Sequence, residues 1–129
     1  MNKHKKIIII VSIMTVIVFY FLSGIAINPL ILWTSLPLYI GYALITHAIK
    51  LPSFKRLYAS YGFIIVSITL SILYHLTWFF DWQGTKTSSS TSALIFIIFP
   101  VYTVILGFVG YALGLILGLW RDKKITEER

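Results

Sequence analysis

The sequence predicts an all-α protein: a four-helix transmembrane bundle of up-down-up-down topology with both termini in the cytoplasm. Hydrophobic residues make up 58% of the chain and charged residues only 12%, whereas about 25% of residues are charged in soluble domains. The apolar residues form four long continuous runs with cations at their flanks. Continuous runs favour helices, because the strands of a membrane barrel alternate apolar and polar residues. Residues 1–129 are therefore expected to form a single integral membrane domain.

Each run is long enough to cross a hydrocarbon core of about 30 Å, which needs about 20 helical residues. The expected spans cover approximately residues 7–27, 30–49, 61–80 and 97–120, and a cytoplasmic tail covers 121–129. The links "NP", "KLPSFKRLYAS" and "DWQGTKTSSSTS" are short and contain turn-forming residues. Short links predict antiparallel neighbours, which gives the up-down-up-down order.

The orientation follows from the positions of lysine and arginine. Three precede the first span, three lie in the second link and four lie in the tail, whereas the third link has only Lys86. Because cytoplasmic loops carry the excess of cations, both termini are expected in the cytoplasm. The net charge of +7 thus reflects membrane orientation and does not indicate a nucleic-acid partner. The expected location is a cell membrane, that of a bacterium, with membrane lipids as partners.

The first run has a second interpretation. The basic start "MNKHKK", the apolar run and the small residues Gly24 and Ala26 also fit a cleavable signal peptide. The run from Ile7 is longer than the apolar core of such a peptide, and the second span follows at once, so a retained helix is the favoured interpretation.

Two prolines predict kinks. Pro37 leaves the carbonyl of Trp33 without its helical donor, and Pro100 does the same to Phe96. A second helix that began only at Leu36 would be about 22 Å long, too short to cross the core. A kinked, full-length second span is therefore expected.

The third run has an amphipathic start and a polar face. Ser53 follows a proline and is suited to cap a helix, and residues 54–61 are expected to extend the third helix along the membrane surface. Within the span, Ser67, Ser71 and His75 recur at steps of four. These three side chains share one face of the helix and are expected to point into the bundle.

Glycines give the fourth run its packing signal. Gly107, Gly110, Gly114 and Gly118 recur at steps of three, four and four, so they form a glycine zipper that lets another helix approach closely. Three partners fit this helix-packing face. It is a contact inside one subunit, a seam between two copies, or the contact of a helix that moves in a transporter.

A candidate polar pocket surrounds His75, because an ionisable side chain within a span suggests function. The residues expected at a similar depth near the outer surface are Tyr74, His75, Trp78, Asp81, Tyr102 and Thr103. Asp81 does not face His75 on a continuous helix, since they lie about 120° apart around its axis and about 9 Å apart along it. Trp78 is expected to belong to the aromatic belt at the membrane surface. The alternative to a pocket is a neutral imidazole bonded to a hydroxyl across a helix contact.

The sequence offers little for metal or covalent chemistry. It has no cysteine, and His47 and His75 are expected roughly 18 Å apart in depth, whereas zinc holds nitrogen ligands at about 2.1 Å. Residues 87–92, "TSSSTS", provide hydroxyls, but no acid is placed to orient His75 as a base. No metal site, cofactor or catalytic residue is expected.

The leading functional hypothesis is a non-catalytic multi-pass membrane protein. It would act through helix–helix association, with itself as a homo-oligomer or with a larger membrane protein, through the glycine face. The runner-up is a small solute transporter or channel that uses an outward-facing pocket near His75. A membrane enzyme is the third hypothesis.

Overall fold

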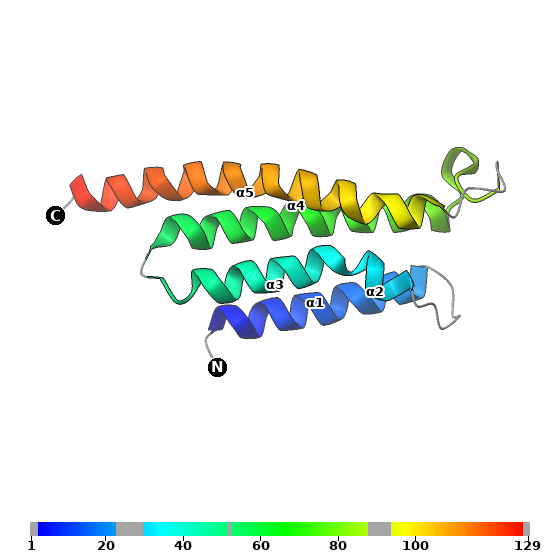
Figure 1. The fold of residues 1–129 in the computed structure, drawn as a ribbon, viewed down its shortest axis with the longest axis horizontal. Helices are drawn as coiled ribbons and strands as arrows, with labels where there is room; N and C mark the ends of the chain where they lie inside the picture. Colours follow the sequence, from blue (N-terminus) through cyan, green and yellow to red (C-terminus); the bar gives the residue numbers. More distant parts are fainter. Residues whose placement is uncertain (1–2, 23–29, 52, 88–93, 128–129) are drawn as a thin grey trace.

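A computed structural model describes residues 3–22, 30–51, 53–87 and 94–127 of the protein (Figure 1), and helices dominate these residues, with no strand among them. The helices, in chain order, are α1 (Lys3–Leu22), α2 (Leu30–Thr34), α3 (Leu36–Ala48), α4 (Phe54–Phe79), the short 3₁₀ helix η1 (Trp82–Gly84) and α5 (Ile95–Glu127). The all-α class expected from the composition is confirmed.

Helix α4 is the centre of the bundle. Its longest contact is with α5, and it also packs against α3 and α1, while α1 packs against α3 and α2 against α5. Ile8, Ile45, Phe63 and Ile64, from α1, α3 and α4, form the buried apolar core. Helix α1 begins and α5 ends at the same end of the bundle (Figure 1).

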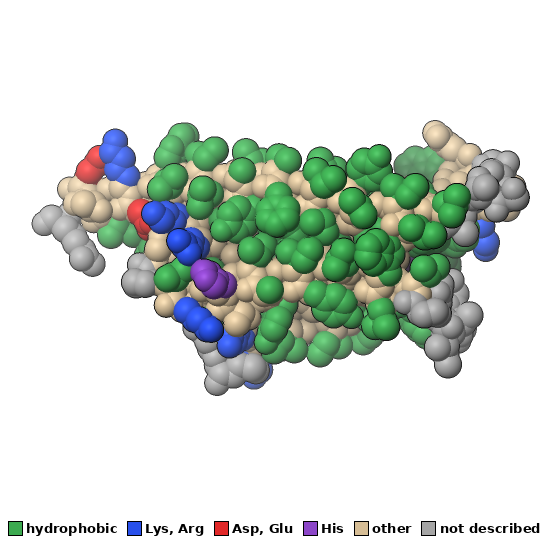
Figure 2. All heavy atoms as spheres, in the orientation of Figure 1, with side chains coloured by type: hydrophobic (Ala, Val, Ile, Leu, Met, Phe, Trp, Pro, Cys, Tyr) green, Lys and Arg blue, Asp and Glu red, His purple; other side chains and the backbone are tan. Residues whose placement is uncertain are grey.

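Charged and apolar side chains are separated along the bundle. On the face that Figure 2 shows, Lys and Arg gather at the end where α1 begins and α5 ends, and hydrophobic side chains cover the middle. An apolar band between polar ends matches the profile of a bilayer. Three helices, α1, α4 and α5, are long and apolar enough to cross a membrane.

The second expected span is broken into two helices, α2 and α3. The chain turns at Ser35 and continues through a bond of 2.9 Å from the Leu38 N–H to the Ser35 carbonyl. Pro37 lies in the first turn of α3, where its missing N–H has no helical partner to lose. The sequence predicts one kinked helix here. The structure has two helices separated by Ser35 alone, whose backbone is itself right-handed helical and whose N–H donates to the Ile31 carbonyl at 3.0 Å.

The first and third expected spans begin earlier than their apolar runs. Helix α1 starts at Lys3, and the expected end of this span and the "NP" link lie outside the described residues. Helix α4 joins the expected surface extension to the span in one continuous helix of 26 residues. Ser53 precedes α4 but makes no side-chain cap. Its hydroxyl instead donates to the Asp122 carboxylate at 3.3 Å, which corrects the capping prediction.

The fourth expected span continues beyond Trp120 as a helix to Glu127, so residues 121–127 of the expected cytoplasmic tail are helical. Contacts with the start of α4 accompany these extra turns, because Arg121 donates to the Tyr58 hydroxyl and Asp122 accepts from Ser53. At the other end, the Trp33 indole N–H donates to the Ile97 carbonyl at 2.9 Å and fastens α2 to α5.

Candidate functional site

The glycine face of α5 packs against α4 of the same chain. A β-carbon added to Gly114 would lie 2.3 Å from the Tyr58 carbonyl oxygen, and one added to Gly118 would lie 2.4 Å from the Lys55 Cα. Real β-carbons do not come this close to backbone atoms, so any side chain here would push the helices apart. The glycines therefore allow contact between the two backbones.

Gly62 of α4 completes this contact from the other side, a partner that the glycine spacing along α5 does not predict. A β-carbon on Gly62 would lie 2.2 Å from the Gly110 carbonyl oxygen, and one on Gly110 would lie 2.5 Å from the Gly62 oxygen. Two small residues three apart, Ala59 and Gly62, were the available signal. The partner of the glycine face within this chain is α4.

His75 lies in an aromatic cluster between α1, α4 and α5. Its side chain is 1% exposed and stacks on Phe19, with ring centroids 4.1 Å apart and planes within 4°. Phe96 and Phe99 meet the imidazole edge-on at 5.6 and 5.3 Å. Ser67 and Ser71, which share its face of α4, are also buried, as their spacing predicts.

The tautomer of His75 follows from its hydrogen bond. Nδ1 lies 2.8 Å from the Ser71 carbonyl oxygen. A carbonyl only accepts hydrogen bonds, so Nδ1 carries a proton. The expected bond to a hydroxyl on another helix is thus replaced by a bond within α4.

Of the six residues expected around a polar pocket, the structure brings four into or beside this cluster. Tyr74 stacks on Phe99 at 4.9 Å, and Trp78 meets Phe96 at 4.8 Å. Thr103 is fully buried and donates to the Phe99 carbonyl at 2.8 Å. Aromatic rings pack around the imidazole, while Tyr74 also lines a separate cavity of about 480 Å³ together with Thr77 and Gln83. The rings from α1 and α5 are tertiary neighbours that spacing along α4 cannot reveal.

The other two residues lie apart from His75. Tyr102 is 53% exposed on the outer side of α5. Asp81 lies beyond the end of α4 in a left-handed backbone conformation, with φ of 50°. Its carboxylate accepts from the Thr87 hydroxyl at 2.6 Å and from the Lys86 N–H at 2.7 Å. These two bonds, the first foremost, lower the pKa of Asp81 below its usual value. Asp81 therefore organises the turn after α4.

The outward face of α3 and of the turn after it forms a further surface, which was not among the residues expected to be functional. We call it the α3 stripe, and it consists of Tyr39, Tyr42, Ala43, Thr46, His47 and Lys50. Each of these side chains except Thr46 is exposed, and Thr46 is half-buried with a hydroxyl that has no hydrogen-bond partner. Their spacing of three and four was the available signal, because it places them opposite the buried residues Leu38, Gly41 and Ile45.

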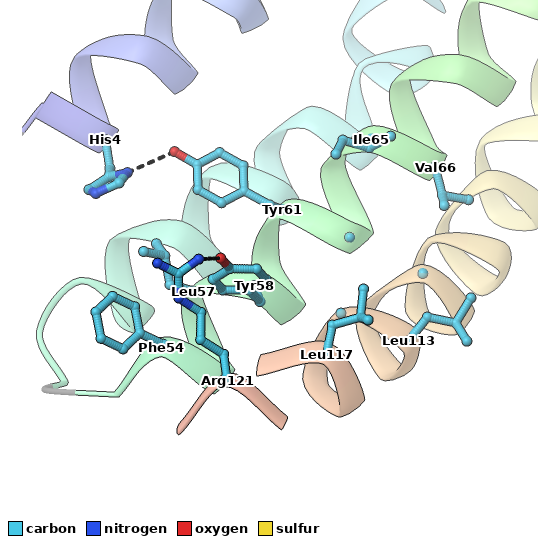
Figure 3. Close-up of a pocket in the computed structure, with 13 residues that line it drawn as sticks. His4, Phe54, Leu57, Tyr58, Tyr61, Ile65, Val66, Leu113, Leu117 and Arg121 are labelled. Atoms are coloured by element: carbon cyan, nitrogen blue, oxygen red, sulfur yellow. Dashed lines mark hydrogen bonds between the residues drawn. The ribbon is translucent and has the colours of Figure 1, made fainter. Parts of the chain in front are cut away.

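A groove runs along α4 and α5 near the basic end of the bundle (Figure 3). We call it the inner groove; its volume is about 640 Å³. Gly62, Gly110 and Gly114 contribute backbone to its lining, and the exposed side chains of Ile65 and Leu113 border it.

Polar side chains close the basic end of the inner groove. Arg121 donates to the Tyr58 hydroxyl, and its guanidinium carbon lies 5.6 Å from the centres of the Phe54 and Tyr58 rings. His4 of α1 and the Tyr61 hydroxyl of α4 are hydrogen-bonded at 2.8 Å (Figure 3). The groove is thus apolar along its length and cationic at one end.

The structure defines an all-helical protein with three helices able to cross a membrane. Among the residues it describes, no three His, Cys, Asp or Glu side chains gather in a way that could hold a metal ion. Comparison with protein families, with curated proteins and with solved structures finds no match for the chain.

Proposed function

We propose that the chain is a non-catalytic, four-span protein of a bacterial plasma membrane that associates with a transmembrane helix of another subunit. That subunit is a second copy or a larger membrane protein. In this arrangement α2 and α3 together cross the bilayer, because Leu30 to Ala48 extends roughly 28 Å at 1.5 Å per residue. The grouping of cations at the end where α1 begins and α5 ends supports cytoplasmic termini.

The α3 stripe is the observation that carries this proposal. The outward faces of α1 and α5 consist mainly of large hydrophobic residues, such as Ile13 and Met14 on α1 and Ile105 and Val109 on α5. The α3 stripe has no aliphatic side chain larger than that of Ala43. One bundle therefore presents two kinds of outer surface, of which only the first resembles a surface adapted to lipid.

The depth of the tyrosines strengthens this argument. Tyr39 lies about 14 Å along the helix from Ala48, near the middle of a core of about 30 Å, and its side chain is 53% exposed. Tyrosines that face lipid are enriched at the membrane surfaces and not at the centre. Small and hydroxyl-bearing residues are typical of contacts between membrane helices, and a neighbouring helix would cover the exposed ring of Tyr39.

Helix α4 already packs against the glycine face of α5. This favours the α3 stripe over the glycine face as the contact with another subunit. The transporter hypothesis loses support for its pocket, because Phe19 and its neighbours enclose His75.

Site-specific photocrosslinking tests the proposal. The chain has no cysteine, so Ala43→Cys creates a unique attachment point on the α3 stripe for a benzophenone maleimide. Ile105→Cys, on the outward face of α5, is the matched control. In native membranes, we expect illumination of the Ala43→Cys protein to give a discrete larger product, at twice 14.8 kDa for self-association or at another mass for a different partner.

A double substitution in the α3 stripe distinguishes a crosslink that reflects binding from one that reflects random encounters in the membrane. We expect Tyr39→Leu combined with Thr46→Leu to reduce the yield of that product while the monomer remains folded. Equal crosslinking of the Ala43→Cys and Ile105→Cys proteins would refute association through the α3 stripe.

A further inference from the structure

We propose that the inner groove binds an anionic phospholipid, with an acyl chain along the groove and the phosphate against Arg121. The site is separate from the α3 stripe, and the proposal requires membrane insertion but not helix association. It assigns a specific lipid to a place on the bundle, beyond the general contact with lipid that every membrane protein makes.

The shape of the groove favours a slender apolar occupant. Its volume of about 640 Å³ lies within the range of about 300–1,000 Å³ that is typical of ligand sites. Gly62, Gly110 and Gly114 line the groove with backbone and no side chain, where α4 and α5 are in close contact. Ile65 and Leu113 at its edge are exposed and aliphatic. An acyl chain fits such a surface without leaving a polar group unsatisfied.

The basic end of the groove favours an anionic headgroup. A guanidinium has five N–H donors and binds phosphate through two parallel hydrogen bonds. One nitrogen of Arg121 bonds the Tyr58 hydroxyl, and the rings of Phe54 and Tyr58 lie beside the cation, so the guanidinium is held in one place.

Arg121 also keeps its charge available. Within the described part of the chain, no carboxylate forms an ion pair with Arg121, since the ion pair near this end joins Lys123 to Glu127. The neighbouring Asp122 accepts the hydrogen bond from Ser53 of the α4 start. Basic pockets between membrane helices on the cytoplasmic side are typical sites for anionic headgroups, and Arg121 lies at the end of the bundle where the cations gather.

Lipid retention in native mass spectrometry tests this inference. The full chain is reconstituted into nanodiscs of equal parts phosphatidylcholine and phosphatidylglycerol and then released into the gas phase. We expect the wild-type protein to retain phosphatidylglycerol in preference to phosphatidylcholine. Because a hydrogen bond to a charged group is a strong one, we expect Arg121→Gln to reduce phosphatidylglycerol retention about tenfold.

Matched variants distinguish a specific lipid site at Arg121 from general attraction of anionic lipid to the basic end of the bundle. Lys123→Gln removes the same charge two residues away and should leave retention unchanged. Leu113→Trp places a bulky ring at the groove and should reduce retention, whereas Ile116→Trp, at an exposed position of α5 outside the groove lining, should not. Circular dichroism of each variant confirms that it folds.

Three results would overturn the proposal. Equal losses in Arg121→Gln and Lys123→Gln would show attraction to the basic end as a whole. Unchanged retention in Leu113→Trp would show that no acyl chain lies in the groove. The third result combines two observations: a crosslinker attached at the inner groove captures another protein, and Arg121→Gln does not change lipid retention. It would show that a helix, and not a lipid, occupies the groove. Each result is distinct from failure of the α3 crosslink, because Ala43 lies on another helix.

Discussion

Helices α4 and α5 meet through their backbones, whereas α1 and α3 join the bundle through side chains. In the first pair, glycines on both helices bring carbonyl oxygens and Cα atoms into contact range. In the second, Phe19 of α1 packs on His75, and Ile45 of α3 contributes to the apolar core. A change at one of the glycines therefore meets rigid backbone, whereas a change at Phe19 or Ile45 meets side chains that can move.

The largest effect should come from breaking the backbone contact. Overpacking a core typically costs about 1–3 kcal/mol, and we expect Gly114→Leu to destabilise the protein by more than this. The new side chain would meet the Tyr58 carbonyl and the Ala59 Cα, which are backbone atoms, and not a flexible side chain. The measurement is the folded yield and thermal unfolding midpoint in mild detergent. Ala112→Leu, at an exposed position of α5, is the control and should change neither.

A smaller effect should follow from weakening the attachment of α1. Phe19 is fully buried against His75, and Phe19→Ala leaves a cavity there. We expect a loss of about 2 kcal/mol, less than in a water-soluble core, because lipid offers apolar surface to the freed side chains. Equilibrium unfolding in mixed micelles measures the loss.

The control for this prediction is Phe21→Ala, since Phe21 is an exposed residue of the same helix and its removal should cost little. A Phe19→Ala protein as stable as the Phe21→Ala protein would show that the attachment of α1 does not depend on the aromatic cluster.

The smallest effect should concern Asp81, in the connection after α4. Its pKa is lower in the folded protein than in the unfolded chain because the folded turn donates hydrogen bonds to the carboxylate. The stabilisation of the turn is therefore complete above the unfolded pKa and is lost as the pH falls through the folded pKa. We expect the Lys86 and Thr87 amide resonances to shift in that acidic window in an NMR titration, and Asp81→Asn to abolish the shift. Resonances of the α4–α5 contact should stay constant.

Periodicity along one helix predicted much of the fold. The spacing of the α5 glycines identified a face for close packing, and the spacing of Ser67, Ser71 and His75 identified the buried side of α4. Both patterns arise because a helix places residues three and four apart on one side. Which helix meets a given face depends on contacts between distant segments, so Gly62 and Phe19 were missed.

The ends of helices were harder to predict, since they depend on neighbours. The expected span ended at Trp120, but α5 continues to Glu127, and Arg121 and Asp122 in these added turns contact the start of α4. Ser53 has the residue type of a cap, yet its hydroxyl bonds Asp122. The restart of the second helix at Ser35 reflects a choice between a kink and a break near Pro37, which proline chemistry alone leaves open.

The length of α5 has a mechanical consequence. Its 33 residues extend about 50 Å, well beyond the hydrocarbon thickness, so the helix must lean or protrude by an amount set by the surrounding bilayer. Because the glycine contacts from Gly107 to Gly118 hold the middle of α5 against α4, a change in membrane thickness would tilt the two helices together. The orientation of the whole assembly thus becomes sensitive to the lipid composition around it.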